Sequence, residues 1–395
     1  MRKATVFGGV CIVAALAVWV GVFVYRNLRG IGPAFAPVPT DIAELAAENK
    51  TGLPLKIPNG FSIEIFAKDL AGARAVKFDP AGNLYVSRTG EGIITRLDIK
   101  DGQVASREDV LTGLRKPHGI AFDLSNPRVL YYAEEHRISR IDLASGATKK
   151  LADLPSGGGH FTRTLGFSPD GRLYVSIGSS CNVCREQDAR RAAIWSLNKD
   201  GSDFRLFARG LRNSVFFIWH PETAQMWATE MGRDLLGDDT PPDEVNIIEE
   251  GKNYGWPTCY GKNIHDAVFD KNTYIRNPCM EPFEKESVID IPAHSAPLGL
   301  AFAPDSWPAQ YRRNLLVAYH GSWNRSTPTG YKVVRMRFDA AGAYEDAEDF
   351  ISGWLVSANS ALGRPVDLVF GPDDALYISD DKAGVVYRLF PPKVQ

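Results

Sequence analysis

The sequence predicts an all-β protein, a six-bladed β-propeller preceded by an N-terminal apolar helix. Three observations indicate this fold. A strand–turn–strand unit occurs six times, a Pro/Asp/Gly turn follows the first strand of each unit, and the first units lie about 45 to 50 residues apart. A repeat of this length built from strands is typical of propeller blades. Stacked sandwiches would not repeat one turn chemistry in every unit.

The N-terminus carries an apolar run that is long enough to cross a bilayer. Two basic residues precede an uncharged stretch over residues 5–25, and Arg26 and Arg29 end it. As a helix this stretch would be roughly 30 Å long. We therefore expect residues 1–29 to be an uncleaved signal anchor or, alternatively, a cleaved signal peptide. Residues 30–55 are expected to form a linker, and residues 56–395 the propeller.

Each repeat unit begins with an apolar strand that ends in phenylalanine, followed by a hairpin-type turn and a second strand. Examples are "AVKFDPAGNLYVSR", "TLGFSPDGRLYVSIG" and "DLVFGPDDALYISDD". Short strands of period two joined by such turns are typical of antiparallel hairpins. The phenylalanines that we align as equivalent are Phe78, Phe122, Phe167, Phe217, Phe302 and Phe370.

Charge and cysteine content narrow the function classes. The net charge is −2, with 45 Lys and Arg against 47 Asp and Glu, so no basic field indicates a nucleic-acid partner. Cys181 lies near Cys184, and Cys259 near Cys279. In a chain expected to be exported, these two local sets indicate two disulfides. "CNVCRE" lacks the histidine of a haem-attachment site, and a single CxxC is a weak signal for zinc.

The stretch "TEMGRDLLGDDTPPDEVN", residues 229–246, places six carboxylates, two glycines and a double proline between apolar runs. Asp, Gly and Pro are ordinary loop residues, so a solvated loop is one interpretation. An oxygen-rich cradle for a hard cation such as calcium is the other. Composition alone leaves both open.

Several ordered motifs resemble the glucose/sorbosone dehydrogenase family. They are "GGGHFTRTLGFSPDGRLYVSIG", "GLRNSVFFIWHP", "TEMGRD…PPDEVNII…GKNYGWP" and "GRPVDLVFGPDDALYISDD". "CNVC", "AHSAPLGL" and "HGSWNRSTPTGYKVVRM" are similar to the sorbosone-type branch. The resemblance covers nearly the whole predicted propeller. It implies a six-bladed quinoprotein that uses pyrroloquinoline quinone (PQQ) and calcium (Ca2+) to oxidise sugars.

His160 matches the family's general base. Oxidation of an alcohol or hemiacetal needs a base for the hydroxyl proton, and a neutral imidazole suits that task near pH 7. A hydrogen-bonded histidine that closes a turn is the alternative. Two departures from the family pattern stand out. Ser179 replaces the usual carboxylate after the next strand, and Arg163 lies three residues after His160, where the family has its arginine at four, the position of Thr164.

Arg212 and Asn213 match the residues that contact the quinone in the family, because a planar charged fork suits a quinone oxygen or a carboxylate. An exposed arginine at a blade edge is the alternative. Gly232 and Arg233 match two positions whose backbone carbonyls bind calcium. The family often has proline at the second position, so we expect the Arg233 side chain to point outward or to find a partner.

Other residues of the same stretch are expected to support it. Glu230 and Asp234 lie beside the two predicted calcium ligands in the sequence. Asp243, Glu244 and Asn246 match a family motif that braces the loop and the blade. The resemblance thus favours the cation-cradle interpretation of residues 229–246.

The carboxylates of PQQ need cationic partners. Arg364 matches one family arginine, but Val366 replaces the second. At the place of the family's lysine the chain has His320, and Arg325 and Lys332 lie close by in sequence. We therefore predict Arg364, His320 and Arg325 as cofactor-binding residues. Solvated loop cations are the alternative.

Three further residues are candidates for substrate contact. His118 and His294 each lie just before the first strand of a blade, where a side chain can reach the mouth of the channel. A capping or packing role is equally compatible with that position. Trp323 could stack on a sugar face, although tryptophan is more often a core residue.

The sequence thus predicts a periplasmic sugar dehydrogenase, tethered to the inner membrane by its N-terminal helix or released after cleavage. A separate cytochrome or quinone would accept the electrons, because this chain has no haem motif. The alternatives are a non-enzymatic propeller that binds a glycan or protein, and a metal-dependent lactonase. The quinoprotein reading requires that His160, Arg212 and the Gly232 carbonyl converge on one channel mouth.

Overall fold

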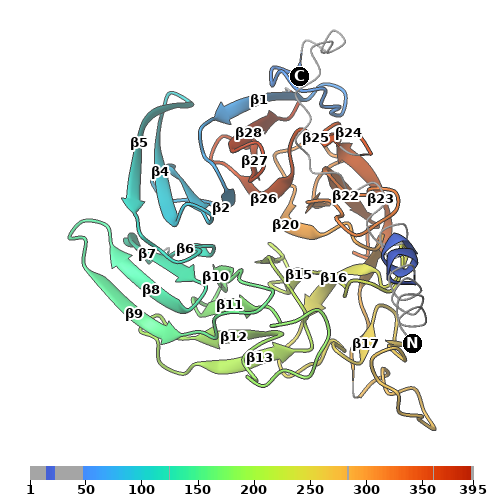
Figure 1. The fold of residues 1–395 in the computed structure, drawn as a ribbon. Helices are drawn as coiled ribbons and strands as arrows, with labels where there is room; N and C mark the ends of the chain where they lie inside the picture. Colours follow the sequence, from blue (N-terminus) through green and yellow to red (C-terminus); the bar gives the residue numbers. More distant parts are fainter. Residues whose placement is uncertain (1–14, 23–47, 124, 283, 359, 393–395) are drawn as a thin grey trace, which may run out of the picture.

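The computed structural model describes residues 15–22, 48–123, 125–282, 284–358 and 360–392. Six four-stranded antiparallel sheets are arranged in a ring around a central axis (Figure 1). The predicted six-bladed all-β propeller is therefore confirmed. In each blade the first strand lies innermost, because the chain runs outward through successive hairpins.

The first three blades each use four consecutive strands. Blade 1 comprises β2 (Ala73–Phe78), β3 (Leu84–Arg88), β4 (Ile93–Lys100) and β5 (Gln103–Leu111). Blade 2 comprises β6 (Ile120–Asp123), β7 (Asn126–Glu134), β8 (Arg137–Asp142) and β9 (Thr148–Asp153). Blade 3 comprises β10 (Leu165–Phe167), β11 (Leu173–Ile177), β12 (Ala193–Leu197) and β13 (Arg205–Arg209).

The last three blades include insertions and a closure. Blade 4 comprises β14 (Phe217–Trp219), β15 (Met226–Glu230), β16 (Asp243–Ile248) and β19 (Ile289–Ile291). Blade 5 comprises β20 (Pro297–Phe302), β21 (Leu315–Tyr319), β22 (Lys332–Phe338) and β23 (Tyr344–Ile351). Blade 6 comprises β26 (Pro365–Phe370), β27 (Leu376–Asp380), β28 (Val385–Phe390) and β1 (Ser62–Ala67). Small hairpins are formed by β17 (Cys259–Tyr260) with β18 (Ile264–His265), and by β24 (Leu355–Ser357) with β25 (Ser360–Ala361).

The ring is closed by strands from opposite ends of the propeller sequence. β1 pairs antiparallel with β28, so that Ser62 lies opposite Phe390 and Ile63 opposite Leu389. Figure 1 shows these two strands side by side, one blue and one red. This pairing supplies the outer strand of blade 6 and completes the circle.

Aromatic pairs between neighbouring blades explain the repeat. The aromatic residue at the end of each inner strand packs edge-on against an aromatic residue of the adjoining blade, and such pairs contribute about 0.5–1.5 kcal/mol each beyond their buried area. Ring centroids lie 4.9–5.6 Å apart in Tyr85–Phe122, Tyr131–Phe167, Tyr174–Trp219, Trp227–Phe302 and Tyr377–Phe78. Between blades 5 and 6, Trp307 from a loop packs on Phe370 at 5.1 Å.

The alignment of Phe217 with the other strand-end phenylalanines is wrong. Phe217 begins β14, and Trp219 occupies the strand-end position, opposite Met226. In blade 3 the equivalent pair is Phe167 opposite Leu173. Because side chains alternate with period two along a strand, a shift of two residues keeps the aromatic residue on the same face. The pattern alone could not separate the two choices.

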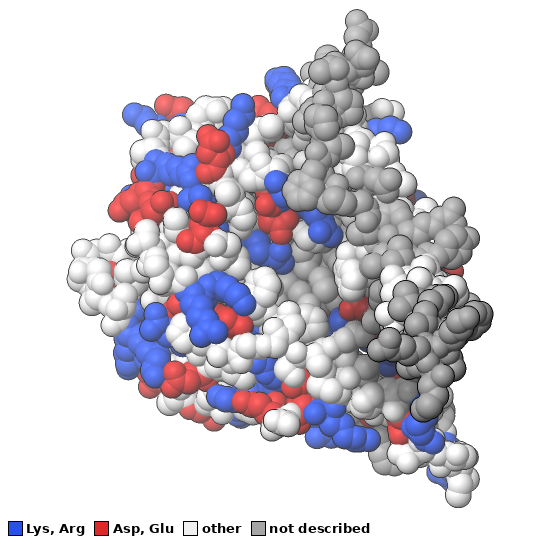
Figure 2. All heavy atoms as spheres, in the orientation of Figure 1, with Lys and Arg blue, Asp and Glu red and all other residues white. Residues whose placement is uncertain are grey.

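Both predicted disulfides are present, Cys181–Cys184 and Cys259–Cys279. On the face seen in Figure 2, acidic and basic side chains are interspersed over the blades. At the N-terminus, residues 15–22 are helical. No helix within the described part of the chain is long and apolar enough to cross a membrane. The rest of the predicted span over residues 5–25, and most of the predicted linker, lies outside the described residues.

The blade topology gathers the predicted site residues at one end of the ring. Within an antiparallel hairpin, the start of the first strand and the end of the second strand lie at the same end. His160, Arg212 and Arg364 precede inner strands β10, β14 and β26, whereas Gly232 and His320 follow second strands β15 and β21. Loops from blades 3 to 6 therefore meet at a common mouth.

Candidate active site

A cavity of about 280 Å3 lies where these loops meet. Its predicted lining residues are His160, Arg212, Asn213, Gly232, His294, His320, Trp323 and Arg364. The cavity is completed by Met231, Asp234, Asp243, Ala296, Gly321 and Asn324. His160, Arg212 and Gly232 thus converge on one cavity, as the quinoprotein hypothesis requires.

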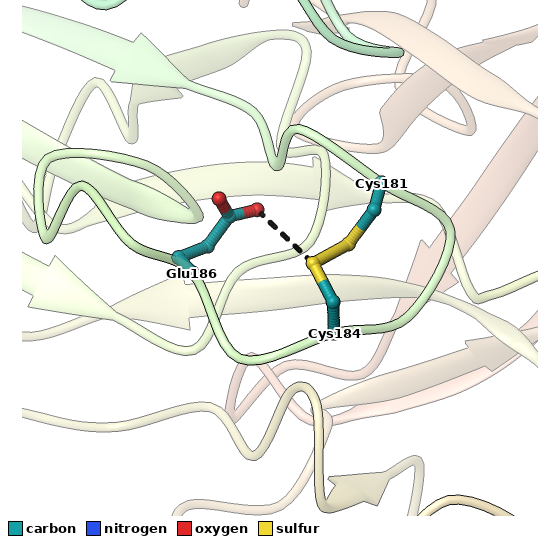
Figure 3. Close-up of side chains that lie close together, drawn as sticks. All are labelled: Cys181, Cys184 and Glu186. Carbon is teal, nitrogen blue, oxygen red and sulfur yellow. Dashed lines mark hydrogen bonds between the residues drawn. A yellow bond between two sulfur atoms is a disulfide. The ribbon is translucent and has the colours of Figure 1, made fainter.

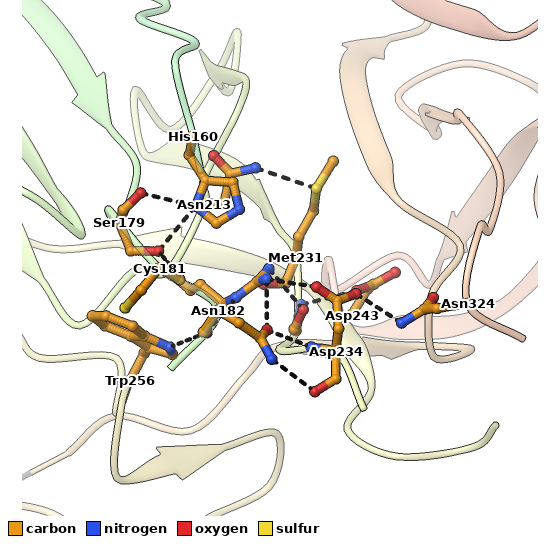
Figure 4. Close-up of polar contacts among 12 residues, drawn as sticks. His160, Ser179, Cys181, Asn182, Asn213, Met231, Asp234, Asp243, Trp256 and Asn324 are labelled. Atoms are coloured by element: carbon orange, nitrogen blue, oxygen red, sulfur yellow. Dashed lines mark hydrogen bonds and ion pairs between the residues drawn. The ribbon is translucent and has the colours of Figure 1, made fainter. Parts of the chain in front are cut away.

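His160 is held in one orientation by neutral oxygens. Its Nδ1 lies 3.0 Å from the carbonyl oxygen of Ser179 and 2.9 Å from Ser179 Oγ (Figure 4). Ser179 Oγ donates its own proton to the carbonyl oxygen of Cys181 at 2.6 Å. Both oxygens near Nδ1 therefore act as acceptors, so this nitrogen carries the proton. The lone pair of the neutral ring then lies on Nε2.

Burial keeps the His160 imidazole neutral. Burial and, to a smaller extent, the Arg212 guanidinium lower the pKa of His160 to about 3, although the hydrogen bond to the Ser179 carbonyl opposes the shift. Replacement of the family's carboxylate by Ser179 therefore leaves the ring oriented but without a charged partner. A neutral acceptor fixes the tautomer without stabilising an imidazolium.

Gly178 allows the close approach of the two blades at this point. A Cβ atom at Gly178 would lie 2.6 Å from Asn213 Oδ1 and 2.7 Å from His160 Cβ. Any other residue would displace one of these two side chains. The glycine of "SIGSS" is therefore required by packing around the candidate base.

The Arg212 guanidinium is almost fully occupied by protein acceptors. Its Nε donates to the Asn182 carbonyl at 2.9 Å, and one NH2 group donates to both Asn182 Oδ1 and Asp234 Oδ2 at 2.9 Å. The other terminal nitrogen donates to the Gly232 carbonyl at 2.9 Å. This side chain is a rigid cationic part of the cavity wall, in contrast to an exposed blade-edge arginine.

Asn213 presents an unused acceptor. Its backbone N–H donates to Glu230 Oε1 at 2.7 Å, and its Nδ2 lies 3.3 Å from Met231 Sδ. Asn213 Oδ1 is buried and has no hydrogen-bond partner among the described residues. A buried polar atom without a partner is costly unless a ligand or water meets it.

Much of the acidic stretch 229–246 braces the site. Asp243 accepts hydrogen bonds from the backbone N–H groups of Gly232 at 2.9 Å and Ala296 at 2.8 Å. Glu244 accepts from Gly261 N–H at 2.6 Å and from Asn246 Nδ2 at 2.8 Å. Burial raises the pKa of Asp243 to about 7 and that of Glu244 to about 6. The bracing role predicted for these residues agrees with their contacts.

Arg233 turns away from the cavity. Its NH1 group forms an ion pair with Asp266 Oδ2 at 2.7 Å, and both side chains are buried. The expectation that this arginine needs a partner is met by Asp266. Only the backbone of Arg233 could then serve a cation near the cavity.

A second histidine of the cavity lining, His320 from blade 5, has charged neighbours. His320 Nε2 lies 2.9 Å from Asp381 Oδ1, and Asp381 Oδ2 lies 2.6 Å from Arg74 NH1. Burial and the Arg364 guanidinium lower the pKa of His320 to about 4, although Asp381 opposes the shift. Burial raises the pKa of Asp381, but His320 and Arg74 outweigh it, so the net shift is strongly downward. An ionised Asp381 requires that Nε2 of His320 donates.

Arg364 is fixed next to His320. Its Nε donates to the His320 carbonyl at 2.9 Å, a terminal nitrogen donates to the Gly321 carbonyl, and the guanidinium lies 5.3 Å from the Tyr331 ring centroid. Val366, which replaces the second family arginine, is fully buried in the core. The cavity therefore has Arg364 and Arg212 as its cationic side chains among the described lining residues.

Besides Arg233, two predicted residues are not brought to the cavity lining. Arg325 instead forms an ion pair with Asp239 at 2.8 Å and donates to two backbone carbonyls. His118 is fully buried beneath the site, 3.3 Å from Thr164 Oγ1 and against the Phe216 ring. These surroundings agree with the packing role that was the alternative to substrate contact for His118.

Three basic or aromatic candidates have clear positions. Lys332 pairs with Asp349 on blade 5, away from the cavity lining. His294 lines the cavity and donates from Nε2 to the Gly237 carbonyl at 2.8 Å. Trp323 lines the same cavity with 47% of its surface exposed, so it is at the mouth and not in the core.

Sequence reasoning missed two residues that organise the site, Asn182 and Asp381. Asn182 lies inside "CNVC", a motif that indicates a disulfide and a family resemblance but assigns no role to the asparagine between the cysteines. Asp381 lies in "ISDD", where it follows a second strand, as Gly232 and His320 do in their blades. That shared position is the signal that could have found it.

Comparison with known proteins places this geometry in a family. A family profile described as TrAA12-like matches residues 55–390. The chain belongs to the TrAA12-like family. A protein of uncharacterised function from Borreliella burgdorferi is 32% identical, over 89% of this chain and 94% of that protein. A pyrroloquinoline quinone-dependent pyranose dehydrogenase of Coprinopsis cinerea is 27% identical over 86% of this chain, which spans 56% of that protein's length.

Solved structures share the fold. The holo form of the PQQ domain of the Coprinopsis cinerea pyranose dehydrogenase superimposes with a TM-score of 0.73 at 23% identity, over 86% of this TrAA12-like chain and 98% of that domain. A calcium structure of a Trichoderma reesei enzyme of family AA12 gives 0.74 at 20% identity, over 89% and 99%. These likenesses confirm the propeller architecture.

Proposed function

We propose that this TrAA12-like protein is a PQQ-dependent sugar dehydrogenase. One observation carries the proposal: a single cavity joins the unprotonated Nε2 of His160 with the guanidinium groups of Arg212 and Arg364. The Coprinopsis cinerea relative, described as a PQQ-dependent pyranose dehydrogenase, aligns over 86% of the chain and supports the same activity. The substrate class is an aldose or a sorbosone-type sugar.

The side chains present fit an anionic quinone. Arginine forks bind carboxylates and quinone oxygens well, because they offer two parallel N–H donors with a permanent charge. Arg364, with His320 beside it, would hold the carboxylates of PQQ, and Arg212 with Asn213 would lie against the quinone oxygens. The bound cofactor supplies the two-electron acceptor.

His160 is the proposed general base. Nε2 takes the proton of the sugar hydroxyl while hydride leaves the carbon that bears this hydroxyl. Nδ1–H stays hydrogen-bonded to Ser179. The pKa of His160, about 3 in the protein alone, rises when an anion next to Arg212 offsets the guanidinium charge. Trp323 offers its half-exposed ring to a pyranose face, and His294 completes the mouth.

Calcium is a finer part of the proposal. It would be held by the backbone carbonyls of Gly232 and Arg233, with the Asp234 carboxylate close by. The Gly232 carbonyl accepts a hydrogen bond from Arg212 at 2.9 Å, so a cation bound to this oxygen replaces that hydrogen bond. Calorimetric titration of the protein with calcium, in parallel with an Asp234→Asn variant, tests the assignment; equal affinity in both would remove Asp234 from it.

The compartment follows from the disulfides. Two disulfide bonds are typical of proteins in oxidising compartments, and we place the enzyme in the periplasm or outside the cell. Electrons pass to a separate acceptor. Anchoring by residues 1–29 is the finer proposal, and fractionation of the full-length chain against a variant lacking residues 1–30 tests it.

The alternatives are less favoured by the contacts. A propeller lactonase needs side-chain oxygen ligands from several blades. Within the described residues, the one group of three His, Cys, Asp or Glu side chains close enough to share a metal is Cys181, Cys184 and Glu186, and both cysteines are in a disulfide. A non-enzymatic binding propeller would not need an oriented base beside two arginines.

The deciding experiment uses the protein lacking residues 1–30, stripped of metal and incubated with PQQ with and without calcium. Dye reduction is followed over a panel of aldoses, sorbosone and simple alcohols, with His160→Ala as the control. We expect turnover with at least one sugar, abolished by His160→Ala. Failure of the wild-type protein to bind PQQ at all would overturn the proposal in favour of a binding propeller.

A further inference from the structure

The loop closed by the Cys181–Cys184 disulfide touches both parts of the proposed active site. It comes a few residues after β11, and its Cys181 and Asn182 accept hydrogen bonds from Ser179 and Arg212, respectively. Figure 4 shows Cys181 next to Ser179. Its base is tied down by Glu186, which accepts hydrogen bonds from Ser180 N–H at 2.6 Å and Ser180 Oγ at 2.8 Å. Figure 3 shows Glu186 pointing toward the disulfide, with its carboxylate 4.0 Å from Cys184 Sγ. The loop is therefore anchored at both ends.

Asn182, at the tip of this loop, uses its polar atoms on the site. Its side-chain oxygen accepts from Arg212 at 2.9 Å and from Asp234 N–H at 2.7 Å, and its Nδ2 donates to the Asp234 carbonyl at 3.0 Å. Its backbone carbonyl accepts from Arg212 Nε at 2.9 Å and from Trp256 Nε1 at 3.3 Å. One residue of blade 3 thus fixes the Arg212 guanidinium and the backbone of Asp234, both residues that line the cavity.

The neighbouring Cys181 acts on the base. Its carbonyl oxygen accepts a hydrogen bond from the Ser179 hydroxyl. Because this hydroxyl proton is already engaged, Ser179 Oγ can only accept a hydrogen bond from His160 Nδ1. If Cys181 moved, Ser179 Oγ could donate to Nδ1 in competition with the Ser179 carbonyl, which accepts from Nδ1 at 3.0 Å. The opposite tautomer, in which Nε2 carries the proton and cannot act as a base, would then become populated beside the present one.

We propose that the Cys181–Cys184 loop is the positioning element of the active site: Asn182 holds Arg212 and Asp234 in place, and the Cys181 carbonyl, together with the Ser179 carbonyl, keeps His160 in a single tautomer. Neither residue touches the cavity as a lining side chain, so both act through others. The part of this inference that concerns catalysis rests on the proposed sugar oxidation, whereas the tautomer of His160 does not.

The second disulfide provides a matched control. Cys259–Cys279 closes a longer loop, with a sequence separation of 20 against 3, in the insertion of blade 4. Neither of its cysteines lines the cavity. Because longer closed loops restrict the unfolded chain more, this bond should matter more for stability, and the shorter one more for the site.

The test compares Cys181→Ser/Cys184→Ser with Cys259→Ser/Cys279→Ser. The tautomer of His160 is read by 15N NMR in cofactor-free protein, with His160→Ala for assignment, and Tm is measured alongside. We expect the first variant to change the single Nδ1-protonated form into a mixture with a small loss of Tm. The second variant should keep the tautomer with a larger loss of Tm. An unchanged His160 spectrum in the first variant would overturn the role of Cys181.

Asn182→Ala tests the other arm, with Asn198→Ala, a surface turn of the same blade, as its control. We expect PQQ affinity to fall about tenfold in Asn182→Ala, because Arg212 loses the Asn182 Oδ1 acceptor while keeping the backbone carbonyl of residue 182, and to stay unchanged in Asn198→Ala. Equal affinity in the two variants would overturn the positioning role of Asn182. Wild-type protein that binds no PQQ would instead refute the proposed function, and the NMR result would still decide the tautomer.

Discussion

Two buried imidazoles line the same cavity, and their neighbours hold them in opposite ways. His160 donates a hydrogen bond from Nδ1 to the neutral oxygens of Ser179. His320 donates a hydrogen bond from Nε2 to the ionised carboxylate of Asp381, which is itself paired with Arg74. A neutral acceptor can orient a ring, whereas a carboxylate both orients it and stabilises its charged form. The difference teaches that these two tasks are separable, and it suggests distinct roles for the two residues.

The largest expected effect comes from removing the base. His160→Ala should lower kcat by about 10²–10⁴-fold, the usual contribution of a positioned proton acceptor, with little change in PQQ affinity. His320→Ala should instead weaken PQQ binding and lower kcat less. Steady-state kinetics on PQQ-loaded protein, together with calorimetric cofactor titration, separates the two. A larger loss of kcat in His320→Ala would reverse the assignment.

Removing the charged partner should cost stability. Asp381→Asn leaves Arg74 without its partly buried carboxylate, and we expect the free energy of unfolding at pH 7 to fall by about 2 kcal/mol. Ser179→Ala, which removes a neutral partner, should cost about 1 kcal/mol. Urea unfolding measures both.

The pH dependence of the Asp381 effect has a definite sign. The pKa of Asp381 is lowered in the folded protein, so the wild-type advantage over Asp381→Asn is complete above about pH 4, the unfolded value. It is lost as the pH falls below that value. An advantage that grew with acidification would show that the carboxylate is not ionised in the native state.

A carboxylate partner for His160, like the one that His320 has, would test the contrast between the two histidines directly. Ser179→Asp places a carboxylate beside His160 Nδ1 and should raise the pKa of His160 from about 3 toward its ordinary range. Ser179→Asn, of similar size but uncharged, is the control and should leave the pKa low. NMR titration of the His160 ring in cofactor-free protein gives the answer, and equal pKa values in the two variants would contradict the electrostatic argument.

The smallest expected change is in the wild-type protein. Burial keeps both imidazoles neutral, so neither should titrate between pH 8 and 5 in cofactor-free protein. The unfolded chain takes up these protons near pH 6.5, so these two groups lower the free energy of unfolding as the pH falls from 6.5. An NMR titration with an apparent pKa above 5 for either ring would contradict the argument that burial keeps that imidazole neutral.

Much of the fold could be predicted from the sequence because its signals are local. Period-two strands, turn residues and a regular spacing identify the blades, and cysteines close in sequence identify both disulfides. The alignment failed at Phe217 because a two-residue shift leaves the strand face unchanged, and only pairing with Met226 identifies Trp219 as the strand end.

The sequence was sufficient to predict which residues form the candidate site, but not which of them contact each other. Motifs identified His160, Arg212 and Arg364, and these residues do line one cavity. They could not show that Arg325 pairs with Asp239 across loops of two blades, or that His118 lies in the core.

By itself, the sequence determined the propeller, its family and the side chains available at the mouth, because strand periodicity, turn chemistry and short motifs are encoded by neighbouring residues. Only the tertiary structure decided which of those side chains face each other. Asp381 meets His320 and Arg74 across 61 and 307 residues of chain, and Asn182 meets Arg212 from another blade. Such contacts exist only once the ring closes, since closure sets the distances between loops that are far apart in sequence.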